Sequence, residues 1–161
     1  MLRVANLGVE QPSTFDIAGA LRDACVSLSR ELNGGFQQHI EITDAIVFGP
    51  RARFVLTVTN LLRNAAQSIA GIANGRVSIA TERDTANVLV HVDDNGPGVP
   101  VANRSVIFEP GVTLRAGGSG QGLALVRQVV EGEMRGTVIC TNGPLGGARF
   151  TVSVPLQSRS T

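Results

Sequence analysis

Asn60 and Asn64 lie one helical turn apart in the run NLLRNA at 60–65, so on a helix both carboxamides would face the same side. Asparagine is a poor helix former because its side chain competes for backbone hydrogen bonds, and two of them in mid-helix need compensation. Their uncharged oxygens could ligate a Mg²⁺ ion that phosphates and water already hold for the most part. The ordinary alternative is a solvated helix face.

A second candidate group is the turn DDNGPG at 93–98, which follows an apolar strand. Gly96 and Gly98 allow positive φ angles and leave room for a flat ligand close to the backbone. An aspartate at the mouth of the turn could accept a hydrogen bond from an exocyclic amine such as N6 of adenine. Aspartate, asparagine, glycine and proline are also the usual turn residues, so the run alone fits an ordinary turn equally well.

A third group is the glycine-rich run GGSGQGL at 117–123, which opens an apolar helix. Backbone N–H groups at a helix start, unobstructed by side chains and aided by the helix dipole, can bind phosphate. The run is not a Walker loop, because no Gly-Lys-Ser/Thr follows. It does not fit a Rossmann fingerprint either, because no hydrophobic strand immediately precedes it and no βαβ unit surrounds it. A flexible linker is the alternative.

Apolar periodicity predicts three helices that would carry these groups. Asp16 can cap a helix over 17–32, which the glycine pair at 34–35 would end. Its apolar stripe is Ile17, Leu21, Ala24, Val26 and Leu28. A helix over 51–70 has the apolar stripe Phe54, Val58, Leu61, Ala65 and Ile69, and the polar stripe Arg53, Thr57, Asn60, Asn64 and Gln67. The third helix, over 122–133, would pack Leu123, Val126 and Val130 inward.

Alternating or short apolar runs predict six strands between and after these helices. They cover 38–42, 46–48, 76–81, 87–93, 136–141 and 148–155, with a turn at 84–85 that makes a hairpin. Residues 1–14 have no clear period and suggest the end of a linker or a docking strand. The order of elements predicts a mixed α/β fold in which the helices group against one sheet.

Composition narrows the function classes. The 161 residues, 43% of them hydrophobic, fit one globular domain. Fourteen basic against thirteen acidic residues and 4% aromatics give no basic stripe or base-stacking surface, so we expect no nucleic-acid partner. No apolar run approaches the ~20 residues of a membrane span, so we expect a soluble, cytoplasmic chain without membrane contact. Cys25 and Cys140 have no metal-ligand spacing and are expected to be buried free thiols.

In combination the motifs resemble a known family. An Asn-rich helix, an Asp-x-Gly-x-Gly turn, the run IFEP at 107–110, a Gly-x-Gly-x-Gly-Leu loop and a Gly-Gly turn at 146–147 follow one another as in the GHKL, or Bergerat-fold, ATP-binding domains. The similarity covers about 16–156, and it is strongest to the catalytic domains of two-component histidine kinases. It implies an α/β two-layer sandwich, in which about three helices cover one face of a mixed, mostly antiparallel sheet.

The resemblance also implies roles for individual residues and makes ATP and Mg²⁺ the expected cofactors. Asn64 would ligate Mg²⁺, and Asp94 would bind the adenine amine. The other nucleotide-binding residues would be Gly96, Gly98, Phe108, Gly118, Ser119, Gly120, Gly122 and Leu123. Phe108 would anchor one end of a lid over about 101–119. Arg115 lies in that lid and could steady a β- or γ-phosphate during transfer, or be a solvated arginine.

Asn60 separates two branches of the family. In the hydrolysing members the corresponding helical position resembles a glutamate that activates water, whereas an amide cannot accept a proton near neutral pH. The sequence therefore favours a kinase over an ATPase. It departs from the family pattern at Pro50, near which an acid is common, at Gln121, and in the lid run at 113–115.

A phosphoacceptor histidine is the element that the sequence does not supply. His39 and His91 both fall within predicted strands, as polar-face residues. We therefore expect a catalytic domain over 16–156, with a linker or docking segment at 1–15 and a flexible tail at 157–161. Its partner would be a histidine-bearing dimerisation domain, in the missing part of the chain or in trans, with a response regulator as an indirect partner. The alternatives are a nucleotide-responsive binding module and a serine kinase of the anti-sigma-factor type.

Overall fold

The computed structural model describes residues 9–32, 37–113, 120 and 122–158. A five-stranded sheet in the order β2-β4-β5-β7-β6 is the centre of the fold, and only its β2–β4 pair is parallel. Its strands are β2 (Gln37–Glu41), β4 (Arg76–Arg83), β5 (Asn87–Asp94), β6 (Thr137–Asn142) and β7 (Ala148–Pro155). A separate two-stranded antiparallel sheet pairs β1 (Ser13–Asp16) with β3 (Ile46–Gly49). The mostly antiparallel sheet expected from the resemblance is confirmed.

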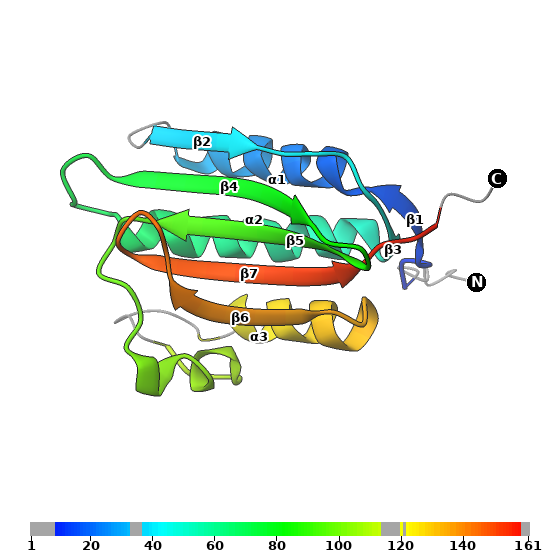
Figure 1. Cartoon of the computed structure of the whole chain (residues 1–161). Helices are drawn as coiled ribbons and strands as arrows, with labels where there is room; N and C mark the ends of the chain where they lie inside the picture. The colour runs from blue at the N-terminus through cyan, green and yellow to red at the C-terminus, as the bar shows by residue number, and fades with distance from the viewer. Residues whose placement is uncertain (1–8, 33–36, 114–119, 121, 159–161) are drawn as a thin grey trace, which may run out of the picture.

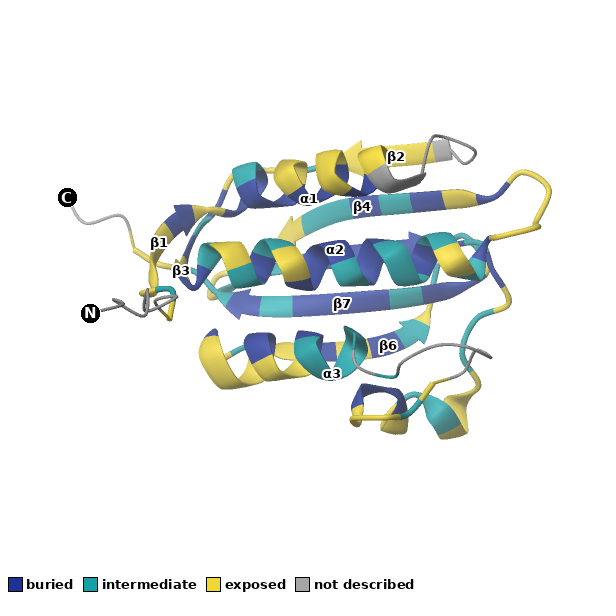
Figure 2. Cartoon of the chain, turned by 180° about the vertical axis from the view of Figure 1, so that it is seen from behind, coloured by how far each residue is buried: buried dark blue, intermediate teal, exposed yellow. Residues whose placement is uncertain are grey.

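The helices lie on one side of the large sheet, and no helix of the described part of the chain covers the other side, called the open side below (Figures 1 and 2). They are α1 (Ile17–Leu32), α2 (Arg51–Ser68) and α3 (Gly122–Arg127), which continues as the π-helical segment η3 (Gln128–Glu133). Figure 2 shows α2 between α1 and α3. Two short 3₁₀ turns, η1 (Val101–Asn103) and η2 (Val106–Phe108), follow β5 at one end of the sheet. No helix among the described residues is long and apolar enough to span a membrane.

The core lies between the helices and the large sheet, and α2 packs on the central strand β5 and its neighbour β4. In β5, Val88, Val90 and Val92 share the helix-facing side, and they pair in register with Val154, Val152 and Phe150 of β7. Against them α2 buries the apolar stripe that periodicity predicts, Phe54, Val58, Leu61, Ala65 and the adjoining Ile69. Buried side chains recur at every second residue in the strands and about every 3.6 residues in the helix, so each element turns one apolar side to the core. The opposite side of α2 is therefore left for other contacts.

The predicted element bounds hold closely. Helix α1 covers the predicted residues, and Asp16 Oδ1 accepts the Ala18 N–H at 3.0 Å, as an N-cap does. The six predicted strands are present to within two residues at either end. Two assignments within the helices were wrong, because Val26 is 52% exposed and Thr57, placed in the polar stripe of α2, is fully buried.

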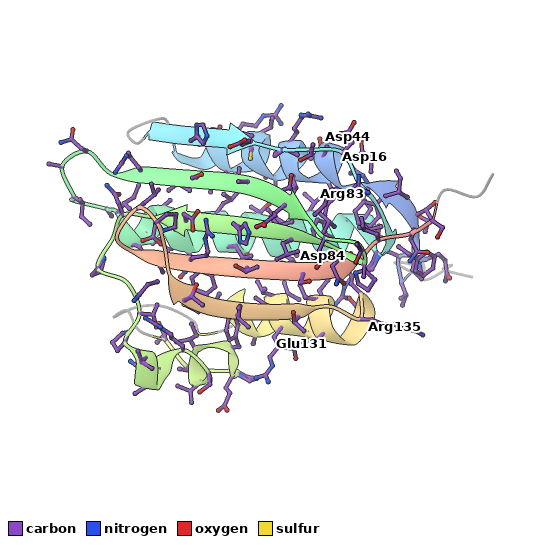
Figure 3. The ribbon with its side chains drawn as sticks, viewed as in Figure 1. Asp16, Asp44, Arg83, Asp84, Glu131 and Arg135 are labelled. Atoms are coloured by element: carbon purple, nitrogen blue, oxygen red, sulfur yellow. The ribbon has the colours of Figure 1, made fainter. Side chains whose placement is uncertain are left out.

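Strand β1 and segment η3 are the elements that periodicity does not reveal. β1 lies partly within the leading segment 1–14, and it forms because Ser13–Asp16 find partners in β3. In η3 the helix widens, and Gly136 N–H donates to Val130 O at 2.8 Å where the segment ends. Figure 3 shows Asp84 at the β4–β5 turn, where its Oδ1 accepts the N–H groups of Ala86 and Asn87, each at 2.7 Å. These backbone hydrogen bonds lower the pKa of Asp84.

Both cysteines are buried free thiols, as expected from their spacing. Burial raises the pKa of Cys25 and raises the pKa of Cys140 to about 11. The thiolate is the reactive form of cysteine, so both side chains should be unreactive at neutral pH.

We expect Cys140 in the folded protein to react with a thiol reagent at pH 8 about 100-fold more slowly than in denaturant, because a pKa of about 11 leaves about 100-fold less thiolate at that pH than an ordinary cysteine has. Stopped-flow absorbance of the Cys25→Ser variant, with and without guanidinium, measures this ratio. Reaction at the denatured rate would contradict the burial of Cys140.

Candidate functional site

Helix α2 presents Asn60 and Asn64 to a cleft of about 1670 Å³. The helix has its apolar side in the core, so both half-buried amides lie on the side turned toward α3. Other cleft walls come from the turn after β5, from η2 and from α3. The lining residues that the sequence predicted are Asn60, Asn64, Gly98, Phe108, Gly120, Gly122 and Leu123.

Asn60 has Arg63 and Gly122 as neighbours. Its Oδ1 accepts a hydrogen bond from Arg63 Nη1 at 2.9 Å, within the same helix. A Cβ atom added to Gly122 would lie 3.9 Å from Asn60 Cγ, so the first residue of α3 is next to this amide. The structure thereby brings the asparagine pair and the end of the glycine-rich loop together, although about 60 residues separate them in sequence.

Asp94 is the last residue of β5 and is 1% exposed. Its Oδ1 accepts the Gly96 N–H at 2.9 Å and, more weakly, the Ala148 N–H at 3.4 Å. Asp94 and Gly96 are not among the cleft-lining residues, whereas their neighbours Gly98 and Ala148 are. The carboxylate therefore lies behind the wall of the cleft, held by backbone donors.

The two glycines of this turn are needed for different reasons. Gly98 has a φ of +77°, as the sequence predicted. Gly96 does not use the positive φ that its lack of a side chain would allow. A side chain at Gly96 would instead collide with Ser68 O, which would be 2.8 Å from its Cβ. Close approach of α2 to the turn thus requires this glycine.

Gly147 is a site residue whose role the sequence did not reveal. Its N–H donates to Asp94 O at 3.1 Å, and an added Cβ would lie 2.5 Å from that oxygen and 2.7 Å from Gly96 N. The Gly146-Gly147 turn therefore packs directly on the backbone of Asp94. A glycine pair just before a strand was the available signal.

Behind Asp94, on the open side of the sheet, a salt bridge joins β5 to β7. Arg149 Nε and Nη2 donate to the two oxygens of Asp93 at 2.7 and 2.9 Å, and these hydrogen bonds raise the pKa of Arg149. Asp93 and Asp94 face opposite sides because side chains alternate along a strand. His91 lies on the same open side, with Thr151 Oγ1 at 2.9 Å and Glu82 Oε2 at 3.1 Å.

The remaining predicted residues divide into those that the structure describes and those that it does not. Gly120 has a φ of +68°, and its carbonyl accepts the Gly111 N–H at 3.1 Å, which ties the glycine-rich loop to the end of the IFEP run. Phe108 is buried and packs edge-on against Phe150 at a centroid distance of 6.0 Å, so it attaches η2 to the core. Arg115, Gly118 and Ser119 lie outside the described residues.

The site contains few ligands for a metal. No group of three or more His, Cys, Asp or Glu side chains is placed to hold an ion within 9–32, 37–113, 120 and 122–158. A Mg²⁺ ion at Asn60 and Asn64 would need most of its oxygens from phosphate and water. Neutral amide oxygens on one wall of an open cleft fit an ion of that kind, which arrives with a nucleotide.

Comparison with known proteins identifies the family. Residues 49–158 match the family described as histidine kinase-, DNA gyrase B-, and HSP90-like ATPase. Sensor protein ChvG of Rhizobium meliloti is 33% identical over an alignment of 173 positions, which covers 94% of this chain and 29% of ChvG. Sensor-type histidine kinase PrrB of Mycobacterium tuberculosis is 40% identical over 113 residues, which cover 68% of this chain and 24% of PrrB.

Solved structures agree with this assignment. The mycobacterial sensor histidine kinase MprB aligns with a TM-score of 0.80 and 25% identity over 92% of this chain and 99% of that chain. The ATP-binding domain of PrrB from Mycobacterium tuberculosis aligns with a TM-score of 0.75 and 31% identity. The alignment covers 91% of this chain and 98% of the PrrB domain. Histidine kinase ThkA, solved in complex with response regulator protein TrrA, aligns with a TM-score of 0.72 and 26% identity. The alignment covers 91% of this chain and 42% of the matched chain.

The chain therefore belongs to the histidine kinase-, DNA gyrase B-, and HSP90-like ATPase family. Within it, the chain is a catalytic ATP-binding domain of the sensor histidine kinase type, as predicted from its motifs. It spans less than a third of the length of the first curated relatives, 29%, 20% and 24% of each.

We expect Gly147→Ala to lower the free energy of unfolding by about 1–3 kcal/mol and to weaken nucleotide binding, because the new methyl group would meet the backbone at Asp94 and Gly96. Thermal unfolding and calorimetric titration with ATP measure the two effects. Gly19→Ala is the matched control, since its Cβ would meet only Arg51 Nη2, at 3.5 Å. Parental stability and affinity in Gly147→Ala would rule out tight packing on Asp94.

Proposed function

We propose that this domain binds Mg-ATP in the cleft and transfers the γ-phosphate to a histidine on a separate dimerisation domain. The main support is that Asn60 of α2 lies beside Gly122 at the start of α3, while Asp94 lies at the end of β5 behind the cleft wall. Those positions suit the phosphate and adenine ends of one nucleotide.

The proposed roles follow from the chemistry of each group. Asp94 accepts a hydrogen bond from the adenine amine, and the backbone near Gly120 and Gly122 faces the phosphates. Asn64 contributes an oxygen to the Mg²⁺ ion, which would neutralise phosphate charge. During transfer the acceptor nitrogen forms a bond to the γ-phosphorus, the bond from phosphorus to the β–γ bridging oxygen breaks, and ADP leaves.

Asn60 favours transfer over hydrolysis. Its carboxamide cannot take a proton from water near neutral pH, and its Oδ1 already accepts a hydrogen bond from Arg63 Nη1 at 2.9 Å. Water in the cleft therefore lacks an activating base at this position. Slow hydrolysis of ATP would preserve the γ-phosphate until a histidine is presented. The proposed roles of Arg115, Gly118 and Ser119 rest on the family resemblance alone.

Partners and location are proposed from the relatives. ThkA has been solved in complex with the response regulator TrrA, which supports a response regulator as the downstream partner of this domain. The relatives ChvG and PrrB are named as sensor proteins, which supports a cytoplasmic catalytic domain working with a histidine-bearing dimerisation domain.

The function can be tested by following the label from γ-³²P-ATP when the domain is mixed with candidate dimerisation domains. Acid-labile label on histidine is expected. We further expect Asn64→Ala to reduce this transfer at least about tenfold while metal-free nucleotide binding is largely kept, because one Mg²⁺ oxygen is lost. Acid-stable label on serine, or no label on any protein, would replace this proposal with one of its alternatives. Transfer at the parental rate by Asn64→Ala would end the Mg²⁺ assignment.

Adenine recognition can be tested at Asp94. Asp94→Asn keeps an oxygen for the Gly96 N–H but removes the carboxylate, so affinity for ATP should fall by about 1–3 kcal/mol while affinity for GTP changes less. Isothermal titration with both nucleotides gives the ratio. Equal affinity of the parent protein for ATP and GTP would show that Asp94 does not select adenine.

A further inference from the structure

Helix α2 begins without a capping residue of its own. The residue at its N-cap position is Pro50, which has extended angles (φ −81°, ψ 96°) and makes no side-chain hydrogen bond to the helix. The first turn contains no acidic residue and has arginines at 51 and 53, whose positive charge opposes the helix dipole. By local sequence alone this is an unfavourable place to start a helix.

The missing cap comes from the segment that precedes β1. Glu10 Oε1 accepts the N–H of Ala52 at 2.7 Å, and Glu10 Oε2 accepts the N–H of Arg53 at 3.2 Å. These are the second and third residues of α2, the two N–H groups that an N-cap side chain normally satisfies. The carboxylate that serves them is 42 residues away in sequence.

Two further carboxylates hold the first turn of α2 through its side chains. Arg51 Nη2 lies 2.7 Å from Asp23 Oδ2 of α1, and Arg53 Nε lies 3.0 Å from Glu133 Oε2 of η3. Both pairs are partly exposed, so each is expected to contribute little to stability. Glu10 differs from them because it binds the backbone itself, and it connects α2 to the leading segment 9–12.

We propose that Glu10 is a positioning residue for the nucleotide site, because it makes the start of the Asn60–Asn64 helix depend on where the leading segment lies. Asn60 is eight residues and about 12 Å along α2 from Ala52, and the helix between them is continuous. The inference rests on the proposed nucleotide site but not on phosphate transfer. A change in the leading segment would thus reach the asparagine pair through α2.

The test uses the linkage between the cap and the nucleotide. In Glu10→Ala, hydrogen exchange at the amides of Ala52 and Arg53 should accelerate about 2- to 30-fold. The affinity for MgADP, measured by calorimetry, should fall by a factor of about 2 to 10. Because linkage is reciprocal, saturating MgADP should stabilise the Glu10 cap by the same factor by which Glu10→Ala weakens MgADP binding. In the parent, MgADP should therefore slow hydrogen exchange at the amides of Ala52 and Arg53. In Glu10→Ala it should not. Glu10→Gln, with one acceptor oxygen, should lie between them.

Two variants separate positioning from simple stabilisation. Pro50→Asp in the Glu10→Ala background supplies a local cap. It should restore slow hydrogen exchange at the amides of Ala52 and Arg53 and the parental affinity for MgADP. Asp23→Asn removes a neighbouring carboxylate that pairs with the side chain of Arg51 rather than with the backbone of α2, and it should keep the affinity for MgADP within about twofold of the parent.

Three results would overturn the proposal. In the first, Glu10→Ala unfolds more easily but binds MgADP like the parent. In the second, Asp23→Asn loses as much affinity for MgADP as Glu10→Ala does. In the third, Pro50→Asp slows hydrogen exchange again but does not restore the affinity for MgADP. A parent protein that binds no MgADP would overturn the proposed function together with this inference. A parent that binds MgADP but labels no histidine would overturn only the phosphate transfer.

Discussion

Helix α2 has to fill the core with one side and form a wall of the nucleotide cleft with the other, and most of the structure is arranged around that requirement. Phe54, Val58 and Leu61 are buried in the core where α2 packs on β5 and β4, which fixes the rotation of the helix about its axis. Once that rotation is fixed, Asn60 and Asn64 have only one direction to face, because positions four apart share a side. Site geometry is in this sense a consequence of core packing.

The adenine end of the cleft depends on a second constraint, the close approach of three backbone segments around Asp94. Gly96 allows α2 to come within contact of the turn, and Gly147 allows the loop before β7 to pack on the strand end. On the far side of the sheet the Asp93–Arg149 pair ties the same two strands together. Backbone N–H groups donate to Oδ1 of the buried Asp94 carboxylate, which offsets part of the cost of burying it.

The first turn of α2 is held by contacts from three other parts of the chain. Carboxylates from the leading segment, α1 and η3 converge on one helical turn that has no acid of its own. Pro50, which the sequence marked as a departure from the family pattern, is where a local cap is absent, and Glu10 satisfies the same backbone groups. With a distant cap in place of a local one, the helix still forms. Its first turn then depends on the position of the leading segment, which supplies Glu10.

The sequence alone determined the elements and the family. Periodicity placed the helices and strands to within about two residues, and the asparagine pair, the Asp-x-Gly-x-Gly turn and the glycine-rich loop identified the ATP-binding fold. These signals are local, so one stretch of chain contains each of them. Tertiary structure decided the rest: strand β1, the exposure of Val26, the packing of Gly147 on Asp94, and the Glu10 cap. Each of these depends on a partner far away in sequence, and no pattern within a single segment can specify which distant backbone group it will meet.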